Sequence, residues 1–173
     1  MQLKSLSLKN FRLFESLNIT IPNKVMLVTG NNAQGKTSLL EAIYYLATFS
    51  SFHASMDRQL IRFDALALNP AVAHIKADFE TNHATRHLEI RLIVQQDRAG
   101  TPRYTKEILL DTAKKKGTEA LGKFNAVLFL PEMTTIIDGS PEERRRYINM
   151  MVAQANTIYI NTLGQYNKAV QQR

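Results

Sequence analysis

Residues 30–37 read Gly30-Asn31-Asn32-Ala33-Gln34-Gly35-Lys36-Thr37, and this stretch is the most informative part of the sequence. Every fixed position of the phosphate-loop pattern G-x-x-x-x-G-K-[ST] is present. The apolar run 25–28 precedes the stretch and a helical pattern at 39–46 follows it, so the sequence predicts a strand, a loop and a helix in this order. A glycine-bearing turn that binds nothing needs only one glycine and has no use for the Lys-Thr pair. We therefore expect a site for phosphates.

Each residue type in this stretch has a physical role beside a phosphate group. Gly30 and Gly35 permit backbone conformations that turn successive N–H groups toward an anion, and Lys36 adds a positive charge. Thr37 begins the helix and offers a hydroxyl to Mg²⁺, while the helix N-terminus adds unpaired N–H groups and partial positive charge. The stretch predicts nucleotide binding, with Thr37 as a ligand of Mg²⁺.

Composition and charge narrow the class of protein. The chain has 173 residues, of which 45% are hydrophobic and 21% charged, as in an ordinary globular domain or part of one. Its net charge of +7 favours a polyanionic partner such as nucleic acid, and the alternative is a charge that only maintains solubility. The absence of cysteine excludes disulfides and suits a reducing compartment. Lys4 and Lys9 interrupt any leader, and no apolar run is long enough to span a membrane, so we expect a cytoplasmic protein.

The residues around the phosphate loop predict a hairpin, a strand and a helix. Alternating apolar residues at 3–8 and 17–21 are typical of two half-buried strands, which we expect to form an N-terminal β-hairpin. The run 25–28 is expected to be the strand that leads into the loop. A helix should extend from Thr37 to about Thr48. Its expected buried face consists of Leu39, Leu40, Ile43, Leu46 and Ala47.

The middle of the chain predicts antiparallel strands. We expect a loop with a short helix at 49–70, followed by strands at 73–79 and 88–94 and a third at 104–110. The run 114–117, Lys-Lys-Lys-Gly, is expected to be a basic turn. It is either a solvated loop or a contact for DNA, and charge runs of this kind are more often solvated.

The last third of the chain predicts two helices. Ser140, Pro141 and Glu143 form a helix start, because Ser140 can cap, proline fits the first helical position and Glu143 completes a capping box. A second helix is expected from about Thr157. Inward-facing positions are predicted at Tyr147, Ile148, Met151 and Val152 of the first helix and at Ile158, Leu163 and Val170 of the second.

Two groups of arginines are candidates for binding anions. Arg144, Arg145 and Arg146 lie in the first turns of a helix, where the macrodipole opposes positive charge, so a phosphate or carboxylate is expected nearby. They either contact DNA, or at least one of them pairs with Glu142, Glu143 or another acidic side chain. Arg12 lies between two predicted strands, where it either reaches a nucleotide phosphate or is an ordinary surface arginine.

The residues that hydrolysis requires are not recognisable in this sequence. The apolar run 126–130 is typical of a fully buried strand. It resembles a Walker B strand, but Pro131 and Glu132 follow it where an aspartate should hold the metal ion, so we reject the Walker B assignment. The four histidines, His53, His74, His83 and His87, have no metal-ligand spacing with carboxylates on one helix face, and we expect ordinary strand or loop residues there. The chain looks like half of a catalytic site.

Several stretches together carry a resemblance to a known family. They are Leu8-Lys9-Asn10-Phe11-Arg12, residues 28–43 with Asn-x-Ala-Gln-Gly-Lys-Thr, residues 57–63, residues 127–132 and residues 139–148. These stretches cover most of the chain and resemble the N-terminal part of the RecF family, the SMC-like, ABC-type ATPases of recombinational repair. His53 departs from the family, which has an arginine or lysine there.

The resemblance implies the fold, the cofactors and the partners. It implies an α/β, ABC-type P-loop NTPase lobe at 1–139, a mixed sheet with an antiparallel portion, followed by the start of a helical lobe at 140–173. Taken with the residue analysis above, we expect ATP and Mg²⁺ on residues 30–37, with Arg12 as a candidate for a phosphate and Arg144, Arg145 and Arg146 as candidates for DNA. Family members dimerise on binding ATP, bind double-stranded, gapped or junction DNA, act with RecO and RecR to load RecA, and belong to the SOS response.

The resemblance also limits the expected activity. Because the signature motif and the Walker B aspartate of the family are missing, we expect a fragment that is inactive by itself, from a weak DNA-dependent ATPase. A small kinase is the alternative enzyme, but no acceptor site is recognisable. A protein-interaction module with a vestigial loop is disfavoured, since Gly30, Gly35, Lys36 and Thr37 are all intact.

Overall fold

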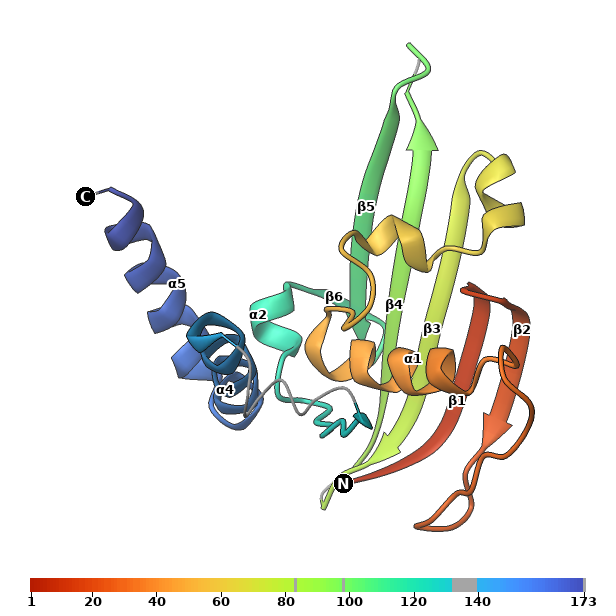
Figure 1. Ribbon diagram of the computed structural model, residues 1–173, viewed down its shortest axis with the longest axis horizontal. Helices are drawn as coiled ribbons and strands as arrows, with labels where there is room; N and C mark the ends of the chain where they lie inside the picture. Colours follow the sequence, from red (N-terminus) through yellow and green to blue (C-terminus); the bar gives the residue numbers. More distant parts are fainter. Residues whose placement is uncertain (83, 98, 132–139, 173) are drawn as a thin grey trace.

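The fold is a six-stranded antiparallel sheet with helices on one face and at one side (Figure 1). The computed structural model describes residues 1–82, 84–97, 99–131 and 140–172. In spatial order the strands are β2 (Phe14–Thr20), β1 (Gln2–Phe11), β3 (Ala71–Glu80), β4 (Thr85–Gln96), β5 (Pro102–Leu110) and β6 (Ala113–Lys115). The predicted N-terminal hairpin and the three predicted strands of the middle segment are confirmed. The α/β fold class is confirmed as well.

Helix α1 (Lys36–Thr48) runs across one face of the sheet and forms the core with it (Figure 1). Alternate residues of β3 and β4, among them Ile75 and Ile90, point toward the helix and are fully buried. Burial of a large aliphatic side chain contributes about 1.5–3 kcal/mol, so this layer is the main source of stability. The predicted end of the helix at Thr48 is confirmed. Leu39 and Leu46 are buried as predicted, whereas Leu40 is exposed because it lies on the side of α1 away from the sheet.

The segment after α1 contains two short 3-10 helices, η1 (Asp57–Leu60) and η2 (Phe63–Ala67), in agreement with the predicted loop and short helix. The predicted basic turn at 114–117 is wrong. Lys114 and Lys115 belong to β6, the edge strand, and the chain reverses instead at Asp111 and Thr112, both of which adopt left-handed backbone angles. Helix α2 (Gly117–Ala120) follows directly.

The two strands predicted at 25–28 and 126–130 are not strands in the structure. Val25 and Leu27 are 84% and 86% exposed, and Val127 and Phe129 are 80% and 85% exposed. A strand requires a neighbour that pairs with its backbone N–H and C=O groups, and neither segment has such a neighbour among the described residues. The strand predictions at 25–28 and 126–130, which relied on apolar composition, are therefore wrong. The motif at 30–37 is preceded by extended chain rather than by a paired strand.

Helices α4 (Pro141–Ala155) and α5 (Thr157–Gln171) lie beside the sheet, next to α2 (Figure 1). The predicted start at Pro141 is confirmed, since Ser140 Oγ accepts from Glu143 N at 3.3 Å and Glu143 Oε2 accepts from Ser140 N at 2.8 Å. Most of the positions predicted to face inward on the two helices are exposed, because the helices pack mainly on each other. Tyr147 and Leu163 are half-buried, but Ile148, Met151, Val152, Ile158 and Val170 are exposed.

The predicted boundary between 139 and 140 adjoins residues 132–139, which lie outside the described residues, so the division stays a prediction.

In the part of the chain that the structure describes, no helix is both long and apolar enough to cross a bilayer.

Candidate nucleotide-binding site

The phosphate loop turns tightly into the N-terminus of α1. Ala33 and Gly35 have φ angles of 62° and 92°, in the left-handed region, and Gly35 is the N-cap residue of the helix. The Lys36 ammonium donates to the carbonyl oxygens of Gly30 at 2.8 Å and Asn31 at 2.6 Å. Lys36 thus bonds back to the start of its own loop. Its ammonium group lies beside residues that we predict to surround the phosphates.

The start of α1 is electrostatically suited to an anion. Its first turn contains no acidic residue, and Gly35 provides no side chain that could cap the helix N–H groups. Thr37 is exposed and Ser38 half-buried in this turn. The positive end of the helix dipole and its N–H groups therefore face a site with a free hydroxyl. These features fit Mg²⁺ and phosphate, with Thr37 as the residue that would hold the metal ion.

A cleft of about 730 Å³ opens beside this turn. One part of its wall is polar and another is apolar. The lining residues are Arg12, Leu13, Thr37, Ser38, Glu41, His53, Gln59, Ile61, Phe63 and Leu66. The structure thus brings Arg12, which is distant in sequence, to the same cleft as Thr37. A volume of this size is in the range of small-molecule sites.

Arg12 is held in the cleft wall by an ion pair with Glu41, a residue that sequence reasoning missed. Its Nε and Nη2 donate to the two carboxylate oxygens of Glu41, both at 2.7 Å, and its Nη1 donates to the Gln59 carbonyl at 3.2 Å. Glu41 is only 1% exposed. It lies four positions after Thr37 on α1, so a charged residue within an apolar helical face was the signal that could have identified it.

Arg144, Arg145 and Arg146 lie on α4, apart from the cleft beside α1. All three are exposed, and none forms an ion pair within the described residues. The alternative in which Glu143 neutralises them is not observed, because Glu143 bonds to Ser140 instead. Arg145 and Arg146 line a hollow between α4 and α5.

A second hollow joins α4 to the loop after α1. Arg146 lines it together with Tyr44 and Tyr147. Burial raises the pKa of Tyr44, Tyr147 adds to the rise, and the positive charge of Arg146 opposes it. Arg146 therefore lies near Tyr44 of α1, although the arginine itself is exposed.

Two of the histidines, His74 and His87, lie beside carboxylates. His74 Nδ1 lies 3.0 Å from Glu89, and His87 Nδ1 lies 2.5 Å from Asp78. The described part of the chain contains no group of three or more His, Cys, Asp or Glu residues that could hold a metal ion.

The comparisons with known proteins point to one group of ATPases. A family model described as "AAA ATPase domain" matches residues 1–158. The chain is 38% identical over 177 residues to the DNA replication and repair protein RecF of Chloroflexus aurantiacus, and 35% identical over 173 residues to that of Bacillus cytotoxicus. These matches include the whole of this chain but only 45% and 43% of the relatives.

A solved structure gives the same result at the level of the fold. The chain superposes with a TM-score of 0.82 and 29% identity on the recombination mediator protein RecF with ATP, from the RecFOR pathway. The superposition covers 99% of this chain and 43% of that protein. The chain therefore spans less than half the length of the relatives that it matches.

Proposed function

Because the chain belongs to the AAA ATPase domain family and is similar to RecF over its whole length, we propose that residues 30–37 bind ATP with Mg²⁺. The observation that carries the proposal is the junction of the loop with α1, where Gly35, Lys36 and Thr37 form an uncapped helix N-terminus beside a 730 Å³ cleft. The ATP named for the solved RecF structure supports the choice of nucleotide.

Each residue of the site has a defined task in this proposal. Lys36 exchanges the carbonyl oxygens of Gly30 and Asn31 for phosphate oxygens, since an ammonium prefers a full negative charge to a carbonyl dipole. The backbone of Asn31, Asn32, Ala33 and Gln34 surrounds the phosphates, and Thr37 holds Mg²⁺. Arg12 faces the cleft with N–H donors that Glu41 and Gln59 do not use.

Hydrolysis requires residues that this chain does not offer in recognisable form. The position after 126–130 lacks the aspartate that holds the metal ion in ABC-type ATPases. We therefore infer that the chain alone binds ATP without turnover, and that a protein with the full length of the relatives is a weak DNA-dependent ATPase.

The wider role that we propose is in DNA repair and replication. The net charge of +7 and the unpaired arginines of α4 support binding to double-stranded, gapped or junction DNA. The RecFOR pathway named for the solved structure supports RecO and RecR as partners, with RecA loaded indirectly. We further infer a homodimer that forms on ATP and a cytoplasmic location, which the cysteine-free composition suits.

Titration of the purified protein with a fluorescent ATP analogue, with and without Mg²⁺, tests the proposal. We expect saturable binding that requires Mg²⁺, that unlabelled ATP displaces and that the Lys36→Ala variant lacks. Binding that survives this substitution, or no binding at all by the folded protein, would contradict an ATP site at residues 30–37. Release of phosphate by this chain at a steady rate would contradict the inferred lack of turnover.

A further inference from the structure

The wall of the cleft contains a carboxylate, Glu41, that the phosphate loop itself does not use. Glu41 is almost fully buried, although an ionised carboxylate is costly to remove from water unless it is paired. Its Oε1 accepts hydrogen bonds from two side chains, Arg12 Nη2 at 2.7 Å and Ser51 Oγ at 2.5 Å. These partners come from different parts of the chain, the N-terminal hairpin and the loop after α1.

The bond to Arg12 fixes one wall of the cleft. The side-on pairing of Nε and Nη2 with both carboxylate oxygens sets the plane of the guanidinium, because two parallel bonds define an orientation as well as a distance. Gln59 accepts from Nη1. Each terminal nitrogen keeps a further N–H, and Arg12 lines the cleft that also contains Thr37.

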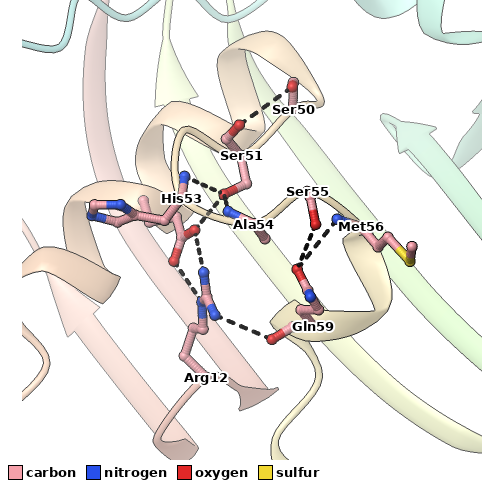
Figure 2. Close-up of polar contacts among 9 residues, drawn as sticks. Arg12, Ser50, Ser51, His53, Ala54, Ser55, Met56 and Gln59 are labelled. Atoms are coloured by element: carbon pink, nitrogen blue, oxygen red, sulfur yellow. Dashed lines mark hydrogen bonds and ion pairs between the residues drawn. The ribbon is translucent and has the colours of Figure 1, made fainter.

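The bond to Ser51 fixes the loop that carries His53 into the same cleft (Figure 2). Ser51 Oγ donates to Glu41 and accepts from the backbone N–H groups of His53 at 2.9 Å and Ala54 at 2.7 Å. The hydroxyl thereby uses its donor and both of its acceptor positions. The buried Ser51 side chain thus links Glu41 to the backbone of residues 53 and 54, so that the position of one depends on the other.

Both ends of this loop are anchored independently of Glu41. Lys106 on β5 donates to the Phe49 carbonyl at 2.9 Å and to Asp57 at 2.7 Å. The ends are therefore tied to the sheet, and Ser51 sets the path of the chain between them. A change at Glu41 should move residues 51–54 without releasing the whole segment.

We propose that Glu41 is a positioning residue for nucleotide binding, which holds Arg12 and the backbone of residues 51–54 as one unit on the walls of the cleft. This inference rests on the proposed ATP site. The carboxylate does not contact the ligand; it fixes the donors that line the cleft before a ligand arrives. Preorganised donors bind more tightly because less ordering is needed on binding.

Glu41→Gln and Ser51→Ala separate the two bonds, and Glu89→Gln is the matched control. Glu89, like Glu41, is a glutamate paired with an arginine, but it is only partly buried and lies on the opposite face of the sheet from α1. Two quantities are measured in the purified protein: the affinity for Mg-ATP, and, without nucleotide, the hydrogen exchange of the Arg12 Nε–H and of the His53 and Ala54 amides.

We expect Glu41→Gln to speed exchange at all three groups and to weaken Mg-ATP binding roughly tenfold or more, since a charge-assisted bidentate pair is lost. Ser51→Ala should speed exchange only at the two amides and weaken binding less. Glu89→Gln should change neither quantity. The Arg12→Lys substitution should weaken binding less in the Glu41→Gln background than in the wild type, because Arg12 has already lost its fixed orientation there.

Wild-type affinity and exchange in a folded Glu41→Gln protein would overturn the inference, as would equal effects of Glu41→Gln and Glu89→Gln or fully additive effects with Arg12→Lys. If Glu41→Gln does not fold, Ser51→Ala decides, since it leaves the Arg12 pair in place. If the wild-type protein does not bind Mg-ATP, the proposed function fails, and unchanged exchange in Glu41→Gln would separately refute the coupling of the two walls.

Discussion

Phe14 packs directly against Gly35: a Cβ atom placed on this glycine would lie 2.7 Å from Cζ of the ring. Leu13 closes the same space, with its methyl groups at 3.1 and 3.2 Å. The turn between β1 and β2 therefore packs against the phosphate loop at the N-terminus of α1. The shape of the loop depends on this contact as well as on its own sequence.

Gly35→Ala should reshape the loop and abolish Mg-ATP binding. The new methyl group clashes with Phe14, and φ of 92° is unfavourable for alanine, so we expect a loss of stability of about 1–3 kcal/mol. Denaturant unfolding and nucleotide titration measure the two effects. Gly30→Ala is the control for the clash, because nothing lies within 4 Å of its position. Equal losses of stability in the two variants would show that the Phe14 contact is unimportant.

Lys36→Ala should separate binding from folding. The Lys36 side chain bonds only to the carbonyl oxygens of Gly30 and Asn31 among the described residues, and lies outside the core. We expect Mg-ATP affinity to fall roughly 10- to 100-fold, as for loss of a charged hydrogen-bond donor, with an almost unchanged melting temperature. Thermal unfolding and titration on one sample check this. A large fall in melting temperature would make Lys36 a structural residue.

Stability should decline as the pH falls from about 4.5 toward 2, in part through Glu89. Burial alone would raise the pKa of Glu89, but hydrogen bonds from Arg91 and His74 and the charges of Lys76 and Arg91 outweigh it and lower the pKa to about 2. A pKa that is lower in the folded state stabilises the fold above the unfolded value and loses this contribution as the carboxylate is protonated.

The Glu89→Gln variant tests this assignment by urea unfolding at pH values between 5 and 2. It should be less stable than the wild type at pH 5, and the difference should shrink as the pH falls. A constant difference across this range would mean that the charge of Glu89 does not contribute.

Replacing Arg144, Arg145 and Arg146 by glutamine should weaken duplex binding equally for all sequences and reduce its salt dependence. Phosphate contacts contain no base information, and each one lost removes about one unit of slope in log affinity against log salt. Binding to duplexes of different sequence, at several salt concentrations, gives the slope. An unchanged slope with a lower melting temperature would assign these arginines to packing against acidic groups.

The sequence was sufficient to predict the local elements and the loop. The hairpin, the central strands and both ends of α1 follow from periodicity and helix signals that neighbouring residues determine by themselves. Ser140 and Glu143 likewise define the start of α4 within a few residues. Patterns of this kind need no information about distant parts of the chain.

What could not be predicted depends on long-range pairing. The run 25–28 has the composition of a strand, but a strand exists only where a partner supplies hydrogen bonds, which local sequence does not report. Glu41 and Ser51 were missed for a related reason. Their importance arises because Arg12 and residues 51–54 meet at one carboxylate, and this meeting is a product of the sheet topology.

The short strand β6 has a consequence for how separate molecules meet. It covers only Ile108 to Leu110 of β5, and two of its three residues are lysines. Lys114 is engaged with Glu107 at 2.7 Å, whereas Lys115 is exposed on the rim. A long, flat edge strand can pair with a strand of another molecule and start aggregation. A short edge strand with two lysines offers few backbone groups for pairing and repels the same positively charged edge of another molecule. We therefore expect this edge of the sheet to resist edge-to-edge aggregation.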